Sequence, residues 1–348
     1  MEHCAARMLA VQFTVSGHET MDPSSPRVSV IIPVKDRRAL LDAALDALDA
    51  QTFDDFEVVV VDDGSRDGSG DAAARRTIKG RPVRVIDGGG NGAVRARIAG
   101  VAASSGEILA FTDSDCAPQP QWLERAVAAF AADTDLVNGK TVAARTPLPL
   151  ERTMGSGEEG LYPTCNVLYR RVAYDKVGGF DVGAADRWRF RLDRRAKGDG
   201  FGEDTLLAWQ VIRSGGVARY VPEAVVEHAV FPPDDLPDLV SRTARVAAFP
   251  AFIKEVPELR PTMLTRGWQL GARSRVPVYA AFAALLLRRP RLTALATVWW
   301  AVLRLQELRA YPVPWKRRLA VLPAEMAVDA VTAGALVVGS VHARSVTL

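Results

Sequence analysis

The chain has 348 residues, of which 48% are hydrophobic and 24% charged, and its net charge is only +3. That length provides one large domain, or one domain with an appendage, and enough chain for a sizeable hydrophobic core. The three cysteines, Cys4, Cys116 and Cys165, form no even disulfide framework and lack metal-ligand spacing. We therefore expect a reducing compartment and no structural disulfide.

The charge is unevenly distributed along the chain. Residues 241–348 contain 16 Lys and Arg against 5 Asp and Glu, a net +11, so the first 240 residues carry a net −8. A basic end on an acidic body indicates an anionic partner such as a membrane leaflet or nucleic acid, or else a solvated basic face. Nucleic acid is disfavoured, because the basic part is apolar and the polar motifs lie in the acidic part.

The first half of the chain alternates between short β-rich runs and helical periodicity. Residues 1–26 lack the features of a signal peptide and are expected to be a flexible leader. Strands are predicted at 27–34, 56–63, 83–87 and 107–113, and helices at 37–51, 67–79, 91–104 and 119–132. Four consecutive strand–helix units predict an α/β fold with a parallel, doubly wound sheet.

Three of the predicted strands end in polar clusters. These are Lys35-Asp36, Asp62-Asp63-Gly64-Ser65 and Asp113-Ser114-Asp115. Asp and Ser are also favoured in ordinary turns, because their side chains bond to nearby backbone. Ligands of such sheets, however, bind at the carboxyl ends of the strands, so three clusters at that edge indicate a binding site.

The remainder of the chain is less regular. A strand is predicted at 136–145, a helix at 203–216, and one or two strands at 217–230. Residues 276–305 hold two apolar stretches separated by charged residues, and the longer apolar stretch 318–343 carries Glu325 and Asp329. These pieces are typical of interfacial or re-entrant helices, and a soluble helical subdomain packed on the sheet is the alternative.

Six segments resemble glycosyltransferase family 2, in that family's order and spacing. They are VSVIIPVKDR, AQTFDDFEVVVVDDGSRDGS, GGNGAVRARIAG, GEILAFTDSDCAP, YRRVAYDKVGGFD and GEDTLLAWQVIRSG, and they run from Val28 to about His228. The resemblance implies a GT-A fold, Rossmann-like with a mostly parallel sheet flanked by helices, over residues 27–240. Residues 241–348 would then form a helical, basic and apolar region that associates with the membrane.

The resemblance assigns a divalent cation, Mn²⁺ or Mg²⁺, to the DxD motif. Asp115 is expected to bind the metal directly, and Asp113 to contact the ribose or the metal through water. His228 matches the position of a third metal ligand in several family members, although a lone histidine is more often packed in a core. Such a cation bridges the two phosphates of a nucleotide sugar and stabilises the leaving diphosphate.

The resemblance also implies residues that bind the nucleotide sugar. Asp63 is expected to accept a hydrogen bond from the base, while Ser65 or Asp67 can cap the following helix at the same time. Arg97 matches a ribose- or phosphate-binding arginine, but Ile98 stands where the family has Asn, and a surface arginine is the alternative. The full set expected here is Pro33, Val34, Asp36, Asp62, Asp63, Arg97, Asp113 and Ser114.

Asp204 is the expected general base, in a motif that begins a helix. In an inverting transfer this carboxylate takes the proton of the acceptor hydroxyl. Acidic residues at a helix start also favour the helix dipole, which is the alternative. On the acceptor side the resemblance places Asn166, Gly179, Phe180 and Glu203. The arginines of 187–195 could form a cationic lid or a solvated loop.

These observations together predict an inverting, metal-dependent glycosyltransferase that uses a nucleotide-diphosphate sugar, with uridine favoured. The chain has no QxxRW signature, which argues for single transfers instead of polymerisation. The acceptor is expected to be a lipid-linked or cell-envelope glycan, at the cytoplasmic face of the membrane, with a soluble cytoplasmic protein as second choice. The alternatives are a non-catalytic sugar-nucleotide binder or membrane scaffold and, less favoured, a nucleotidyltransferase.

Overall fold

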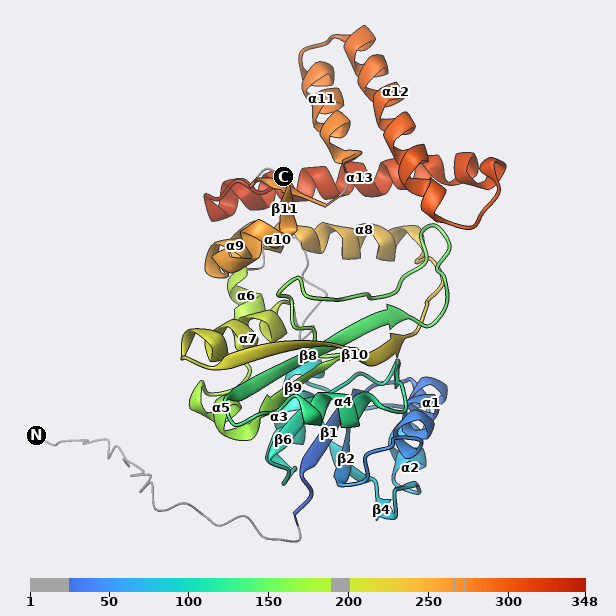
Figure 1. The fold of residues 1–348 in the computed structure, drawn as a ribbon. Helices are drawn as coiled ribbons and strands as arrows, with labels where there is room; N and C mark the ends of the chain where they lie inside the picture. Colours follow the sequence, from blue (N-terminus) through green and yellow to red (C-terminus); the bar gives the residue numbers. More distant parts are fainter. Residues whose placement is uncertain (1–24, 189–200, 266, 272) are drawn as a thin grey trace, which may run out of the picture.

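The computed structural model describes residues 25–188, 201–265, 267–271 and 273–348. An eight-stranded sheet with helices on both faces forms the body, and a set of C-terminal helices lies across one end of it (Figure 1). The predicted α/β class with a mostly parallel sheet is confirmed. The expected leader falls almost entirely outside the described residues.

One half of the sheet is parallel and contains the four predicted strands. These are β1 (Val28–Val34), β2 (Phe56–Asp62), β5 (Arg84–Asp87) and β6 (Ile108–Phe111), in the spatial order β5-β2-β1-β6. Their runs of Val and Ile suit strands that are covered on both faces. The carboxyl ends of all four therefore lie at one edge of the sheet.

The other half of the sheet mixes strand directions. β9 (Val167–Arg170) pairs antiparallel with both β6 and β8 (Thr134–Ala143). β10 (Val217–His228) runs parallel to β8, and the short β7 (Cys116–Pro118) pairs antiparallel with β10 at the edge. Residues 217–228 thus form one strand, which brings His228 beside Cys116.

Two hydrophobic cores sandwich the sheet. On one face, Val30 and Ile32 pack with α1 (Arg38–Asp49) and α4 (Trp122–Ala128). On the other face, Ile31 packs with α3 (Ala93–Ala102), α5 (Arg171–Lys176) and α7 (Glu203–Arg213). This alternation follows from the two-residue period of a strand.

The helix predicted at 67–79 is wrong beyond its first turns. α2 covers only Ser69–Ala73, and the chain then forms a small hairpin of β3 (Thr77–Ile78) and β4 (Arg81–Pro82). Lys79 and Gly80 adopt positive φ angles at its turn, and Ile78 is buried in the core. The β-branched pair and the glycine favour a hairpin over a continued helix.

The C-terminal region is helical, as expected. It comprises α8 (Leu236–Ala244), η1 (Arg245–Ala248), α9 (Phe249–Glu255), η2 (Pro257–Leu259), α10 (Arg260–Met263), a hairpin of β11 (Leu264–Thr265) and β12 (Gln269–Leu270), α11 (Arg275–Leu286), α12 (Pro290–Glu307), η3 (Leu308–Ala310) and α13 (Trp315–Ala343). Among the described residues, α13 alone is long and apolar enough to cross a membrane.

α13 lies between two groups of C-terminal helices (Figure 1). It lies along α8, η1 and α9, while α11 and α12 project away from the body (Figure 1). A third core joins Leu336 of α13 to Phe252 of α9, and both to Trp188 of α6 (Ala184–Trp188) and Leu206 of α7. α9 and α13 therefore share a core with helices α6 and α7 of the sheet domain.

Close contact between α13 and η1 depends on one glycine, which yields a first prediction. A Cβ at Gly339 would overlap the backbone carbonyl of Ala247, whereas a Cβ at Gly334 would meet nothing within 4 Å. We expect Gly339→Ala to lower the free energy of unfolding by about 1–3 kcal/mol through overpacking. Gly334→Ala should raise it by up to about 1 kcal/mol, because alanine favours a helix.

Thermal unfolding followed by circular dichroism compares the two variants under identical conditions. An unchanged midpoint for Gly339→Ala would contradict the packing of α13 on η1.

Candidate active site

A cavity of about 610 Å³ lies at the carboxyl ends of β1, β2 and β6. This is the edge where the sequence predicts a binding site. Of the predicted residues, those lining the cavity are Pro33, Val34, Asp36, Asp63, Arg97, Asp113, Ser114 and Asp115.

The two aspartates at the end of β2 have different surroundings. Asp63 faces the cavity, and its two carboxylate oxygens accept hydrogen bonds from the backbone N–H groups of Asn91 (2.7 Å) and Gly92 (2.9 Å). Asp62 instead accepts from the N–H of Ser65 (2.8 Å) and lies against Gly70 of α2. Asp62 therefore holds the turn together, while Asp63 joins the turn to the glycine-rich loop that follows β5.

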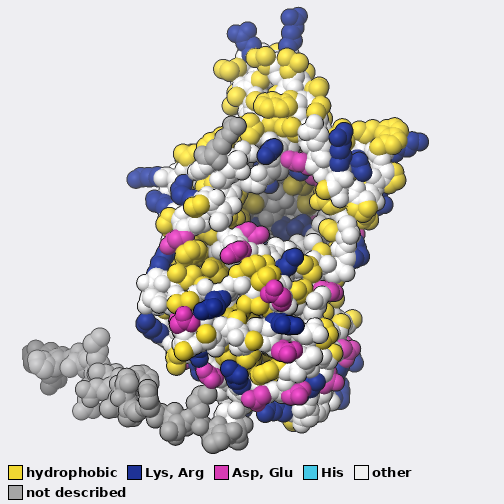
Figure 2. All heavy atoms as spheres, viewed as in Figure 1, with side chains coloured by type: hydrophobic (Ala, Val, Ile, Leu, Met, Phe, Trp, Pro, Cys, Tyr) yellow, Lys and Arg dark blue, Asp and Glu magenta, His cyan; other side chains and the backbone are white. Residues whose placement is uncertain are grey.

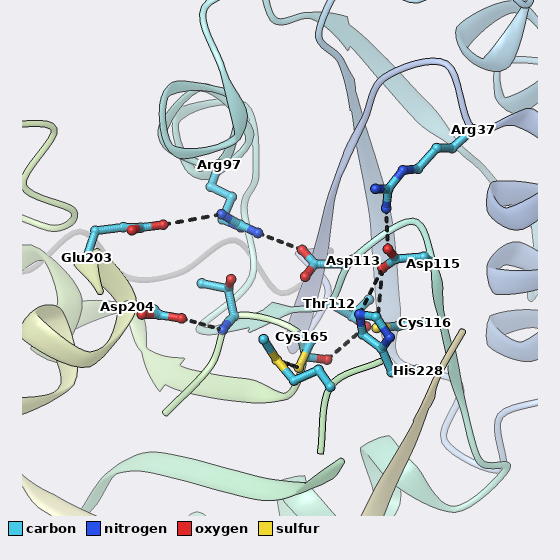
Figure 3. Close-up of polar contacts among 12 residues, drawn as sticks. Arg37, Arg97, Thr112, Asp113, Asp115, Cys116, Cys165, Glu203, Asp204 and His228 are labelled. Carbon is cyan, nitrogen blue, oxygen red and sulfur yellow. Dashed lines mark hydrogen bonds and ion pairs between the residues drawn. The ribbon is translucent and has the colours of Figure 1, made fainter. Parts of the chain in front are cut away.

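Arg97 is buried and connects two acidic motifs that are distant in the sequence (Figure 3). Its Nη2 donates to Oδ1 of Asp113 at 2.6 Å, and its Nη1 lies 3.8 Å from Oε1 of Glu203. The pKa of the Arg97 guanidinium is raised by Asp113 and Glu203 against the opposing effect of burial. Arg97 is thus no surface arginine: it points from α3 into the site and stays charged.

Asp115 lies between Arg37 and His228 (Figure 3). Nη1 of Arg37 donates to Oδ2 of Asp115, and Nε2 of His228 lies 3.7 Å from Oδ1. Nδ1 of His228 lies 2.8 Å from the carbonyl oxygen of Ala229, which can only accept. Nδ1 therefore donates a proton to this carbonyl, and Nε2 is the ring nitrogen that faces Asp115.

This corner of the site has side-chain donors that could bind a divalent cation. Asp115 offers a carboxylate oxygen, and His228 offers its Nε2. The other ring nitrogen of His228, Nδ1, contacts a backbone carbonyl, as is common in metal-binding histidines. Cys116 Sγ is near both, but burial and its contact with Cys165 raise the pKa of the Cys116 thiol well above its usual range. Oδ1 of Asp115 and Nε2 of His228 could therefore hold a divalent cation between them, while Oδ2 of Asp115 is bound to Arg37 and Oδ1 of Asp113 to Arg97.

Asp204 lies in the first turn of α7, beside the same cluster (Figure 3). Its Oδ2 accepts from the N–H of Thr164 (3.3 Å) and its Oδ1 from the N–H of Thr205 (2.8 Å). The pKa of Asp204 is raised, chiefly because surrounding protein atoms desolvate its carboxylate. A carboxylate that is fixed and more basic than usual can accept a proton from a neighbouring hydroxyl.

Glu203, the residue before Asp204, is buried. Burial and the adjacent Asp204 raise its pKa to about 7, although Arg97 opposes that rise. Glu203 lies beside Arg97 and does not line the cavity. It is therefore best described as a partner of Arg97.

The residues expected on the acceptor side lie in the protein core. Asn166 is fully buried and uses its side chain on Trp122, Lys140 and Ala224. Gly179 has a positive φ angle and leaves room for the ring of Tyr174, against which Phe180 also packs. These side chains are occupied by the fold, so the geometry gives them no free group for an acceptor. Most of the lid expected at 187–195 lies outside the described residues.

Sequence reasoning missed several parts of the cavity wall. Arg37, Gly90, Gly92 and Ala93 line it together with the predicted residues. The glycines follow β5 at the same sheet edge as the three polar clusters, and this position is the signal that could have identified them. Arg37 follows the first cluster directly.

The raised pKa of Glu203 makes a prediction about stability. The folded chain keeps a proton on Glu203 between pH about 4.5 and 7, where the unfolded chain has released it, so wild-type stability falls as the pH rises through this window. Glu203→Gln removes this titration. Its unfolding midpoint relative to wild type should therefore rise from pH 5 to pH 8, by the equivalent of at most about 3 kcal/mol.

Differential scanning calorimetry at a series of pH values measures this difference. Glu124→Gln, at an exposed position, is the control and should stay parallel to wild type. If the unfolding midpoint of Glu203→Gln relative to wild type stays constant or falls as the pH rises, Glu203 is ionised throughout this range.

Comparison with known proteins places the chain among relatives. Residues 29–181 match the family model for glycosyl transferase family 2. The chain is 34% identical over 177 residues to glycosyltransferase AglE of Haloferax volcanii, covering 46% of this chain and 58% of the relative. It is 29% identical over 229 residues to the pre-mycofactocin glycosyltransferase of Mycobacterium tuberculosis, covering 59% of this chain and 43% of the relative. The chain thus spans about half the length of these curated relatives.

A solved structure supports the same fold. The mannosyltransferase PcManGT from Pyrobaculum calidifontis, in complex with GDP-Man and Mn²⁺, superposes with a TM-score of 0.50 over 93% of this chain and 89% of that one. At 20% identity this likeness shows a common architecture and nothing finer. The strand order, the acidic motifs at the strand ends and the matched segment lead to one conclusion: the chain has a GT-A-like fold, and its residues 29–181 belong to glycosyl transferase family 2.

Proposed function

We propose that this protein is an inverting, metal-dependent glycosyltransferase that moves one sugar from a nucleotide-diphosphate sugar to a hydroxyl acceptor. The observation that carries the proposal is that a buried arginine connects two acidic motifs, about ninety residues apart, of which the first lines the cavity. Asp113 and Asp115 line that cavity, and Arg97 joins Asp113 to the segment of Glu203 and Asp204. A turn or a helix cap would explain either motif alone, but not their connection through a buried arginine.

The residues present fit the chemistry of a single displacement. Asp115 and His228 would hold a divalent cation, which when bound stabilises the charge of the leaving diphosphate. Asp204 takes the proton of the acceptor hydroxyl while that oxygen bonds to the anomeric carbon and the bond to the diphosphate breaks. Arg97 keeps Asp113 in place and lowers the electrostatic penalty of carboxylates buried side by side.

Asp63 is the proposed contact for the nucleotide base. Its carboxylate lines the cavity beside the glycine loop, where it could accept from a ring N–H. Uridine is the favoured nucleoside, and the GDP-Man bound to the Pyrobaculum relative makes guanosine the main competitor. The acceptor is proposed to be a glycan or a lipid-linked molecule at the cytoplasmic face of the membrane.

Two substitutions separate donor binding from turnover. We expect Asp115→Asn to abolish Mn²⁺-dependent binding of the nucleoside diphosphate, because it removes the charged metal ligand. Asp204→Asn should keep that binding but lose at least about 10²-fold in turnover, the scale of general base catalysis. The exposed Asp175→Asn is the matched control and should retain both properties.

Calorimetric titration with UDP, GDP and dTDP, with and without Mn²⁺ or Mg²⁺, measures binding, and release of the diphosphate from the matching sugar donors measures turnover. Binding by wild type with full turnover in Asp204→Asn would refute its role as base. Metal-dependent binding with no turnover in wild type, for any donor tested with a range of acceptors, would favour the non-catalytic binder.

A further inference from the structure

We propose that the hairpin formed by α11 and α12, residues Arg275–Glu307, inserts into the lipid bilayer, and that α13, despite its length, does not. This inference rests on the membrane location given under the proposed function, and it names the element that contacts the lipid. It is independent of the transfer chemistry, because no residue of the hairpin lines the active-site cavity.

The surface of α11 is apolar almost all round. Residues 276–287 contain no charged side chain, and Tyr279 supplies the single hydroxyl. Leu285, Leu286 and Leu287 are 61%, 84% and 70% exposed. Leu285 and Leu286 are the last residues of α11 and Leu287 follows them, so exposed leucines face different directions at this end of the helix. A helix that is apolar on most sides and uncovered is suited to a surrounding apolar medium.

α12 has the same character. Residues 292–303 are uncharged, and the exposed members include Leu292, Leu295 and Val298. The two threonines of this stretch donate their hydroxyls to the helix itself, Thr293 to the carbonyl of Arg289 (3.3 Å) and Thr297 to that of Thr293 (3.0 Å). No hydroxyl of α12 therefore requires water, as lipid contact demands.

The hairpin stands on α13 through a buried ionic cluster. Nη2 of Arg304 lies 2.8 Å from Oδ2 of Asp329 and 3.3 Å from Oε2 of Glu325. The indole N–H of Trp300 also donates to Oδ2 of Asp329, at 2.9 Å. This cluster explains the two acidic residues in the apolar stretch of α13 and fixes the direction in which the hairpin projects.

α13 itself is unsuited to lipid, although it is long and apolar enough to cross a membrane. Along its length, Glu325 and Asp329 anchor the hairpin, Leu336 enters the core shared with α9, and Gly339 touches η1. Its path runs across the body and not away from it (Figure 1). Extraction of α13 into a bilayer would expose the buried acids and break that core.

The charges at the tip favour a bilayer over a second protein copy. Arg288, Arg289 and Arg291 are exposed at the turn, and Figure 2 shows Lys or Arg side chains at the end of an otherwise hydrophobic projection. A partner copy would cover one face, whereas the exposed leucines at the end of α11 face different directions. The apolar segments are about 18 Å long, and snorkelling arginines would extend their reach to lipid phosphates across a locally thinned bilayer.

Vesicle flotation of the purified full-length chain tests the proposal. We expect wild type to float with vesicles of phosphatidylcholine and phosphatidylglycerol, and Leu286→Glu/Leu295→Glu to lose at least about tenfold in partitioning. Both leucines are exposed, so the charges should not disturb folding. Val341→Glu, at a 75% exposed position of α13, is the matched control and should float like wild type.

Other outcomes would overturn the inference. Loss of flotation in Val341→Glu but not in the double variant would assign lipid contact to α13. A wild-type dimer that does not float, and that the double variant splits into monomers, would show that a second copy covers the hairpin.

Tryptophan fluorescence provides a readout that needs no charged variant. Trp299 is 48% exposed on α12, so brominated acyl chains should quench wild type more than Trp299→Phe. Equal quenching in the two proteins would contradict insertion of the hairpin. Because nucleotide binding is measured separately, failure of this proposal would leave the transferase proposal standing, and the reverse also holds.

Discussion

The site depends on one buried guanidinium. Asp113, Glu203 and Asp204 bring three carboxylates together, and burial together with their mutual repulsion raises the pKa values of Glu203 and Asp204. Arg97 projects from α3 between the strand-end motif and the start of α7, and contacts both. Its own pKa stays high because those carboxylates compensate for its burial. The arginine thus permits an acidic site in a poorly solvated place.

The parallel half of the sheet supplies the frame for this arrangement. β1, β2 and β6 end at one edge, so residues more than fifty positions apart share a cavity. The sequence predicts this frame, because the alternation of strands and helices predicts a parallel sheet, and ligands of such sheets bind at the carboxyl ends of the strands. The connection through Arg97 does not follow, since local periodicity says nothing of where a long side chain on α3 ends. The resemblance to the family suggested that Arg97 contacts the ribose or a phosphate. In the structure, Arg97 lies instead between the carboxylates of Asp113 and Glu203.

The acceptor-side residues illustrate a second limit of sequence reasoning. Asn166 belongs to a family-like segment, yet its amide satisfies backbone carbonyls of β8 and β10 and the indole of Trp122. A polar side chain in a motif can contact a ligand, or it can satisfy all its hydrogen bonds inside the protein, and the motif alone does not distinguish these two roles. Likewise, a count of apolar residues favours α13 as the lipid-contacting helix, and only the tertiary contacts of Glu325 and Asp329 indicate otherwise.

The direction of the hairpin bears on how an acceptor would reach the site. β1 runs toward the layer of C-terminal helices, so its carboxyl end, which carries the cavity, faces the same side of the body as α13 (Figure 1). The hairpin leaves the opposite side of α13 and projects further away. With the hairpin in lipid, the helical layer separates the cavity from the bilayer surface. An acceptor anchored in that bilayer would have to extend its hydroxyl past α8 and α13, which favours one whose reactive group is carried on a long polar portion over one whose hydroxyl lies at the lipid surface.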